Sequence, residues 1–423
     1  MYGRAMLLVL LLAGSLFPAC SRFLDQSRKA DIVVASDGSG DYKTIQDAIA
    51  AIPLTNRERI VVFIKKGTYR EKIRVNASCL TLRGQSRKET RIQFSQLTND
   101  FTAHPDEIGW AVINLNEAND FVLENLTVEN TANSVLAHAL TISGSGDRTV
   151  IVDCDVLSQG GDTLALGGRE RGYYYHARCN FSGSVDFVCP RGSCYITDSN
   201  FYAYTRNASV WHEGNDQTKF IMRNCRFDGV NGFILGRGFR NPRFYFLDCR
   251  FSRRMRDEPI RSMFHPLNSS PVPRRLQHSY FYNCHRSAGD FDWFTNNLSS
   301  APGAPKPNEI SAAWTFAGKW DPENRTGPTI QQTRVIKRRV AVTFSEPVTV
   351  KGKPRLKMCQ GGVANYVSGS GDDTLCFERD SDREDELCGV DLNGGAIIAS
   401  QASAMLRSAN LDVQRRPNSA EKR

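Results

Sequence analysis

Apolar residues occur along most of this chain in short runs that are closed by polar positions. Clear examples are the runs at 121–123, 149–152, 219–222 and 244–247. Runs of this length, rich in β-branched and aromatic residues, predict short β-strands. The stretch 44–52 differs, because its apolar residues repeat at helical spacing and predict one short amphipathic helix. These residues are Ile45, Ala48, Ile49 and Ile52.

A short phrase recurs after many of these runs, with a polar residue, then a small or apolar one, and an apolar residue at its end. Its copies lie at 124–128, 153–156, 178–181, 198–201, 224–227, 248–251 and 283–286. Their intervals of 20 to 35 residues, in a β-rich context, indicate a solenoid. Stacked coils of a parallel β-helix place equivalent side chains about 4.8 Å apart, so we expect ladders of similar residues inside it. The helix at 44–52 would cover the first coil, whose sheet edge would otherwise be open.

Twelve cysteines in one chain would usually suggest a disulfide framework. Five of them instead take the same place in the recurring phrase, where Ser199 stands once: Cys154, Cys179, Cys225, Cys249 and Cys284. A narrow interior favours small apolar groups, so we interpret these five as buried thiols and not as disulfides or metal ligands. Two pairings stay open, of Cys189 with Cys194 and of Cys376 with Cys388.

The first twenty residues have the layout of a secretory signal peptide. Arg4 precedes an apolar run at 6–17, and Pro18 and Ala19 form a small-residue exit. The run is too short for a spanning helix, and no other segment is long and apolar enough. We therefore expect an exported protein without a membrane span, secreted, periplasmic or associated with the outer surface of a bacterium. Cys20 could carry a lipid anchor, which stays an alternative to free secretion.

Composition narrows the class of partner. Of 423 residues, 23% are charged and 40% hydrophobic, as in soluble globular proteins, and the formal net charge is +9. A positive field attracts acidic partners. The basic residues are scattered and no nucleic-acid-binding motif accompanies them, so we expect an acidic polysaccharide as the partner and no nucleic acid. We also expect a monomer.

The pattern changes after residue 300, where three prolines mark a loop. Alternating residues at 340–348 and the turn-rich stretch at 366–371 predict a second, small β-sandwich over 328–414. The sequence of this segment resembles the immunoglobulin-like repeats of bacterial surface proteins. The acidic stretch 378–386 reads as a solvated loop rather than a calcium site, and 415–423 as a disordered tail.

Two aspartates and one arginine stand out as candidate chemistry. Asp162 lies in Gly-Gly-Asp-Thr-Leu, Asp186 in Gly-Ser-Val-Asp-Phe and Arg237 in Leu-Gly-Arg-Gly-Phe. The aspartates are 24 residues apart, about one coil, which would put their carboxylates on the order of 5 Å apart if they share a face. Carboxylates that close should split their pKa values, and Arg237 could hold the ionised one.

These three phrases, in this order, resemble those of the pectin methylesterase (pectinesterase) family. The opening phrase at 33–42 and the Gly-x-Tyr-x-Glu at 67–71 resemble its entry motifs, and the resemblance covers roughly 31–325. It implies a right-handed single-stranded parallel β-helix with a short N-terminal capping helix, followed here by the small Ig-like β-sandwich. It also implies hydrolysis of pectin (homogalacturonan) methyl esters to pectate and methanol, without metal or cofactor.

The resemblance also implies roles. Asp186 matches the nucleophile that forms an acyl-enzyme, Asp162 the general acid and base, and Arg237 the residue that orients the nucleophile. Phe239 stands where the family has a substrate-stacking tryptophan, and Phe187 keeps the aromatic beside the nucleophile. His212 could also line the substrate groove.

The chain departs from the family at the oxyanion site. Two glutamines that contact the tetrahedral oxyanion are replaced here by Leu136 and Gly161. Loss of one such donor can slow an enzyme about 100-fold. His138 and Gln159 each lie two positions from a lost glutamine, so strand alternation puts them on the same face as candidate replacement donors. A packing role for His138 is an equal alternative.

Other functions remain open at this point. A catalytically weakened scaffold that binds acidic polysaccharide would explain the missing glutamines. Polygalacturonases and pectate lyases share the fold, but the phrases match neither, and no dense aspartate cluster for calcium is present. A related esterase acting on another ester, such as an acetylated sugar, is a further alternative.

Overall fold

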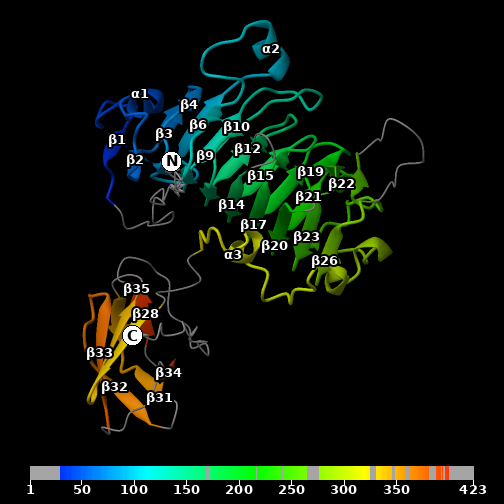
Figure 1. Ribbon diagram of the computed structural model, residues 1–423. Coiled ribbons are helices and arrows are strands. Elements are labelled where there is room, and N and C mark those ends of the chain that lie inside the picture. The colour runs from blue at the N-terminus through cyan, green and yellow to red at the C-terminus, as the bar shows by residue number, and fades with distance from the viewer. Residues whose placement is uncertain are drawn as a thin grey trace, which may run out of the picture.

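The computed structural model describes residues 29–167, 172–215, 217–240, 242–263, 276–323, 330–344, 348–358, 362–380, 387–391, 393 and 396–399. The predicted signal peptide, Cys20 and the predicted tail at 415–423 lie outside these ranges. Most of the described chain forms a solenoid of three parallel sheets, with few helices (Figure 1). The predicted all-β architecture, a parallel β-helix followed by a smaller β-unit, is confirmed.

From β2 onward, the described strands join the three sheets in turn, and only the last coil, β26 and β27, lacks a strand in the third sheet. Sheet 1 contains β1 (Ile32–Val34), β2 (Ile60–Ile64), β5 (Leu80–Gly84), β8 (Val122–Glu124), β11 (Thr149–Val152), β14 (Tyr173–Ala177), β17 (Ser193–Thr197), β20 (Lys219–Arg223), β23 (Arg243–Leu247) and β26 (Ser279–Tyr282). Sheet 2 contains β3 (Gly67–Tyr69), β6 (Thr90–Phe94), β9 (Thr127–Asn130), β12 (Asp155–Leu157), β15 (Asn180–Gly183), β18 (Asn200–Ala203), β21 (Arg226–Gly229), β24 (Arg250–Phe251) and β27 (His285–Arg286). Sheet 3 contains β4 (Ile73–Val75), β7 (Ile113–Asn116), β10 (Ile142–Ser145), β13 (Leu164–Leu166), β16 (Val188–Pro190), β19 (Ala208–Gly214), β22 (Ile234–Arg240) and β25 (Arg261–Ser262).

The recurring phrase forms the corner between sheets 1 and 2. Its first turn residue has a positive φ, between 50° and 57°, in seven coils: Asn125, Asp153, Arg178, Asp198, Asn224, Asp248 and Asn283. Asn and Asp tolerate this left-handed conformation better than other non-glycine residues, which explains their recurrence. The chain then turns sharply enough to begin the next sheet.

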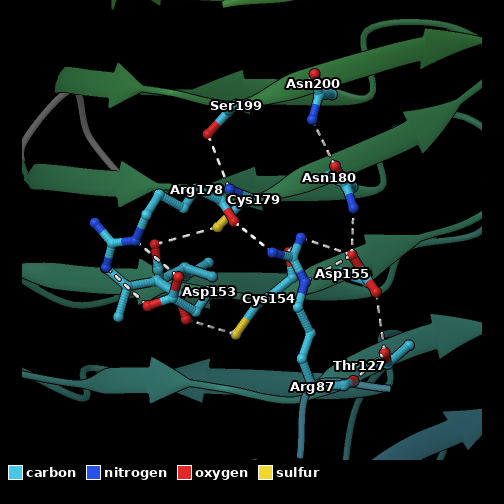
Figure 2. Close-up of polar contacts among 12 residues, drawn as sticks. Arg87, Thr127, Asp153, Cys154, Asp155, Arg178, Cys179, Asn180, Ser199 and Asn200 are labelled. Atoms are coloured by element: carbon cyan, nitrogen blue, oxygen red, sulfur yellow. Dashed lines mark hydrogen bonds and ion pairs between the residues drawn. The ribbon is translucent and has the colours of Figure 1, made fainter. Parts of the chain in front are cut away.

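The next residue of each phrase points into the solenoid, as predicted. The five cysteines are at most 4% exposed and their thiols are free, and Ser199 is 1% exposed. Neighbouring coils are joined here by short contacts: Cys179 Sγ lies 3.4 Å from the Ile151 carbonyl oxygen, and Ser199 Oγ accepts from the Cys179 N–H at 3.0 Å (Figure 2). Cys189, Cys194 and Cys376 are also free thiols, so neither open disulfide pairing forms.

A short helix covers the first coil, as the apolar pattern predicts. It is α1 (Ile45–Ala50), whose N-cap Thr44 accepts from the Asp47 N–H. The four apolar residues predicted for its inner face are buried. The Glu71 carboxylate accepts from the first two helical N–H groups, those of Ile45 and Gln46, at 3.0 Å each. The Gly-x-Tyr-x-Glu motif therefore anchors this helix to the solenoid, where the carboxylate also complements the helix dipole.

Other helices are short. The helix α2 (Thr98–Ala103) lies in the excursion between β6 and β7, and η1 (Asp292–Phe294), η2 (Leu298–Ser300) and α3 (Ala312–Thr315) follow the last coil. The segment 298–320 packs its apolar residues against the tyrosines on the outer face of sheet 1. Among the described residues, no helix is long and apolar enough to cross a membrane.

The C-terminal strands form a separate antiparallel unit. One sheet contains β28 (Ile330–Ile336), β29 (Arg339–Phe344), β31 (Arg355–Met358), β32 (Val363–Ser368), β33 (Thr374–Arg379) and β34 (Leu387–Asp391), and a second pairs β30 (Val348–Lys351) with β35 (Ala396–Ala399). The two sheets share one apolar core that includes Val342, Leu356, Phe377 and Ile397. This is a small β-sandwich, while its likeness to Ig-like repeats stays a prediction.

Candidate active site

The two candidate aspartates occupy equivalent places in successive coils, just before strands of sheet 3. Asp162 precedes β13 and Asp186 precedes β16, and both have a positive φ, of 55° and 48°. The Asp162 N–H donates to the Val185 carbonyl and the Asp186 N–H to the Ala208 carbonyl, at 3.1 and 2.7 Å. The structure thus places both carboxylates at the same edge of sheet 3, one coil apart.

Asp186 and Arg237 form a bidentate ion pair. Arg237 Nε lies 2.9 Å from each oxygen of the Asp186 carboxylate, and its Nη2 also donates to Oδ2. The Asp186 side chain is 5% exposed and that of Arg237 31%. Burial raises the pKa of Asp186 above its ordinary value, the Arg237 guanidinium opposes this rise, and the Asp162 charge adds to it. The predicted contact between these two residues is present.

Asp162 faces His138. Nδ1 of His138 lies 3.3 Å from Oδ2 of Asp162, and the two side chains are 52% and 25% exposed. The hydrogen bond to Asp162 raises the pKa of His138 above its usual 6.5. Behind the carboxylate, Cys189 Sγ lies 3.9 Å from Asp162 Oδ1. His138 therefore lies beside Asp162, although residues 135–137 form a bend and not the strand on which the alternation argument relied, and its role as an oxyanion donor stays a prediction.

The imidazole of His138 also occupies the space that a side chain at Gly161 would need. His138 forms an isolated parallel bridge with Gly161 on the next coil. A Cβ added at Gly161 would lie 2.8 Å from His138 Nδ1 and equally close to Val185. A side chain at position 161 is therefore incompatible with the present position of the ring. The imidazole of His138 can lie here only because residue 161 is a glycine.

Two predicted substrate-binding residues are wrong. Phe187 is 0% exposed and packs beside Phe201, with ring centroids 6.4 Å apart. His212 is also 0% exposed, and its Nδ1 lies 2.9 Å from the Pro190 carbonyl oxygen inside the solenoid. Burial lowers the pKa of His212 to about 4. Strand alternation explains the second error, because Val210 and His212 share the inner face of β19.

The remaining predicted residues lie at the surface. Gln159 is exposed and Phe239 partly exposed, with the Arg240 guanidinium 5.8 Å from the Phe239 ring. Leu136, which stands where the family has a glutamine, is 95% exposed. No contact joins Gln159 to the aspartates among the described interactions, so its role stays a prediction.

Sequence reasoning named Glu213 beside His212 as a possible groove residue but missed Trp211, and both Trp211 and Glu213 point outward from β19. Trp211 is in register with Cys189 on β16, through the pairing of Val188 with Val210, and with Arg237 on β22. Arg191 holds its guanidinium 5.4 Å from the Trp211 ring and its Nε 3.0 Å from Glu213 Oε2. The local sequence carried no signal for their orientation, because either set of alternating residues along 208–214 could have faced outward.

The solenoid and its site define a parallel β-helix protein with two carboxylates and an arginine at one edge of sheet 3. In the described part of the chain, no group of three or more His, Cys, Asp or Glu residues is placed to hold a metal ion. Residues 31–238 match the family model described as Pectinesterase. The resemblance to pectin methylesterases is therefore confirmed for this part of the chain.

Individual relatives agree with this match. The chain is 29% identical to Pectinesterase 2 of Citrus sinensis over 216 residues, which are 49% of this chain and 41% of the relative. It is 32% identical to the pectinesterase of Petunia integrifolia over 207 residues, which are 47% of this chain and 53% of the relative. The chain thus spans about half the length of these curated relatives, or less.

Solved structures show the same fold. The pectin methylesterase from carrot aligns with a TM-score of 0.55 at 21% identity, over 69% of this chain and 97% of that one. The pectin methylesterase PemA from Erwinia chrysanthemi aligns with a TM-score of 0.57 at 17% identity, over 70% of this chain and 99% of that one. At these identities the likeness concerns the fold of the β-helix.

Proposed function

We propose that this chain is an exported carbohydrate esterase that hydrolyses methyl esters of pectin to pectate and methanol. The observation that carries the proposal is the buried ion pair of Asp186 with Arg237, with a second carboxylate, Asp162, one coil away. The family match over 31–238 supports the reaction class. One solved neighbour is a pectin methylesterase in complex with a hexasaccharide, which supports an oligosaccharide substrate.

In the first step, a carboxylate oxygen of Asp186 attacks the ester carbonyl carbon. The carbonyl π electrons move to oxygen, and the tetrahedral oxyanion then collapses and breaks the bond to the methoxy oxygen. Asp162, in its protonated form, gives its proton to the departing oxygen, which leaves as methanol. Arg237 holds Asp186 in its ionised form and orients it, since an ion pair favours the charged carboxylate.

In the second step, water cleaves the acyl-enzyme anhydride. The Asp162 carboxylate takes a proton from the attacking water, whose oxygen bonds to the acyl carbon. Asp186 leaves as a carboxylate, Asp162 is again protonated, and the released uronic acid ionises to the uronate by giving its remaining proton to solvent. The cycle uses no electrons from outside and needs no metal or cofactor.

We assign the oxyanion donor to His138 rather than Gln159. When His138 is protonated, its Nδ1–H can donate to Asp162, and its Nε2–H remains for an oxyanion in front of the site. The half-exposed imidazole is accessible from solvent. The contact with Asp162 distinguishes His138 from Gln159.

A second candidate function is a binding scaffold without catalysis. The exposed Leu136 and the absence of a side chain at Gly161 favour it, because both places lack a donor for the oxyanion. Export itself rests on the N-terminal apolar run, and detection of the processed protein outside the cytoplasm would test it.

Methanol release from highly methylated pectin tests the proposal. Asp186→Asn should lower kcat by about 10⁴-fold or more, since it removes the attacking carboxylate. The control is Asp198→Asn, the same change at a corner aspartate with similar backbone conformation. Equal loss in both variants, or none in Asp186→Asn, would refute the assigned nucleophile. A wild-type protein that binds pectin without releasing methanol would support the binding scaffold.

A further inference from the structure

The segment that carries His138 has little structure of its own. Residues 131–140 join β9 of sheet 2 to β10 of sheet 3, and their backbone forms one isolated bridge, between His138 and Gly161. On one side, the Ala139 N–H donates to the Gly161 carbonyl oxygen on the next coil, at 3.2 Å. On the other side, the His138 carbonyl oxygen accepts from the Thr98 N–H on the preceding coil, at 2.9 Å. Contacts with both neighbouring coils therefore set the place of His138.

The donor of the second contact belongs to a loop and not to a strand of the solenoid. Thr98 is the first residue of α2, in the excursion 95–112 that leaves the solenoid between β6 and β7 (Figure 1). The helix α2 is six residues long, and none of its residues is buried. Because a helix this short is not stable alone in water, other contacts must fix its position.

Lys72, between β3 and β4, supplies these contacts. Its side chain is 6% exposed and forms an ion pair with Asp106. Its ammonium also donates to Gln96 Oε1 at 3.2 Å and to the Gly109 carbonyl oxygen at 2.9 Å. The same ammonium lies 5.3 Å from the centre of the Phe101 ring, which belongs to α2. One buried cation thus contacts the start, the middle and the end of the excursion.

We propose that Lys72 and Thr98 are positioning residues for His138. Lys72 fixes the excursion, and the Thr98 N–H then holds the backbone of His138 so that the imidazole contacts Asp162. The inference rests on the proposed function, because the role of His138 as oxyanion donor belongs to that function. It adds that a loop of the preceding coil, and not only the neighbouring strand, sets the place of this donor.

The protonation of the imidazole reports on its position. The hydrogen bond to Asp162 raises the pKa of His138, burial lowers it, and the charges of Asp186 and Arg237 act in opposite directions. Asp100, in the first turn of α2, is exposed. When the ring moves away from Asp162, its raised pKa falls back toward 6.5, so a displaced ring is detected by a lower pKa.

Titration of the His138 imidazole by NMR tests the proposal independently of activity. Thr98→Pro removes the N–H donor, while proline suits the first position of a helix and the extended backbone of Leu97 before it. The pKa of His138 should fall by about half a pH unit or more. The matched control is Thr98→Ala, which keeps the N–H and loses a hydroxyl without a hydrogen-bond partner among the described residues. Equal pKa values of His138 in wild type and Thr98→Pro would overturn the proposal.

Lys72→Met tests the contact that fixes the excursion. Methionine keeps the length of the stem and removes the donors, so the pKa of His138 should again fall. The kcat of methanol release should fall about tenfold, with the alkaline limb of the pH profile at lower pH. The control is Lys219→Met, because the Lys219 ammonium donates in the same way to the Trp314 and Thr315 carbonyl oxygens, over the outer face of sheet 1. Equal changes in the two lysine variants would overturn the assignment.

A double variant distinguishes a positioning role from a merely structural one. If Lys72 acts through His138, Lys72→Met should lower kcat about tenfold in the wild-type background and leave it unchanged in the His138→Ala background. Equal losses in both backgrounds would overturn the proposal. Thr98→Pro keeps the test decisive if Lys72→Met does not fold.

The NMR titration and the methanol assay together separate this inference from the esterase proposal. A lower pKa of His138 in Thr98→Pro, with no methanol release by the wild-type protein, would keep the positioning role and refute the esterase. Methanol release by the wild-type protein, with the pKa of His138 unchanged in Thr98→Pro, would keep the esterase and overturn the positioning role.

Discussion

The solenoid uses aspartates in the left-handed conformation at two places, and they differ in burial. At the corner between sheets 1 and 2, Asp153 has φ 54° and binds Arg178 on the next coil at 2.7 Å (Figure 2). At the edge of sheet 3, Asp186 has φ 48° and binds Arg237 two coils further on. The side chains of Asp153 and Arg178 are 28% and 51% exposed, whereas that of Asp186 is 5% exposed.

The two aspartates have similar backbone conformations, so the difference between a structural ion pair and a candidate reactive one lies in burial. Water screens the ion pair at the corner, so this pair contributes little to the free energy of unfolding. At the sheet edge, loss of water raises the pKa of Asp186 and makes its charge depend on Arg237. The residue on the neighbouring coil also differs. The neighbour of Asp186 at the edge of sheet 3 is a second aspartate, Asp162, whereas the neighbour of Asp153 at the corner is an arginine, Arg178. Each of the two carboxylates on adjacent coils of sheet 3 has its own partner, Arg237 for Asp186 and His138 for Asp162.

The largest effect among these contacts is expected from Arg237→Gln. A buried carboxylate without its partner costs about 4 kcal/mol, which corresponds to a loss of kcat/KM on the order of a thousandfold. The acid limb of the pH–rate profile should also move to higher pH, because the pKa of Asp186 rises further. Stopped assays of methanol release across pH measure both effects. Retained activity with an unmoved acid limb would show that Arg237 does not set the charge of Asp186.

A smaller effect is expected at His138. Loss of the donor in His138→Ala should lower kcat/KM about 100-fold. His138→Gln should recover part of the rate, because the amide can donate without titrating. An Ala variant with unchanged kcat/KM would return His138 to a packing role.

The assignment of His138 also predicts how activity changes with pH. Asp162 and Asp186 raise the pKa of His138 and Arg237 lowers it, with a net rise above 6.5. The imidazolium donor is present below that pKa and is lost as pH rises through it, so wild-type activity should fall on the alkaline side. His138→Gln should remove this limb while the acid limb, above the ordinary 3.8 of an aspartate, remains. An alkaline limb that persists in His138→Gln would assign it to another group.

The smallest effect is expected at the corner. Asp153→Asn keeps a residue that tolerates positive φ and loses only an exposed ion pair with Arg178. The free energy of unfolding should fall by at most about 1 kcal/mol, and methanol release should be unchanged. Denaturant unfolding and the same activity assay check this. A large loss of activity would contradict the distinction between the two sets of aspartates.

Much of this architecture could be predicted from local pattern. The cysteine ladder and the strand runs follow from a repeat whose period is visible in the chain. The helix α1 follows from Ile45, Ala48 and Ile49 together with its N-cap. The motifs around Asp162, Asp186 and Arg237 also located the two aspartates and the arginine that contacts one of them.

The sequence by itself determined the stacking of coils, the interior cysteines and the candidate carboxylates, because repeats and left-handed turns are properties of short segments. Only the tertiary structure decided that Phe187 and His212 turn inward while Trp211 and Glu213 turn outward. It also decided that His138 fills the space beside Gly161 and contacts Asp162. The phase of each strand is set at the preceding corner, and contacts across coils join residues whose spacing varies with every loop. For that reason the orientation of these side chains could not be derived from local pattern.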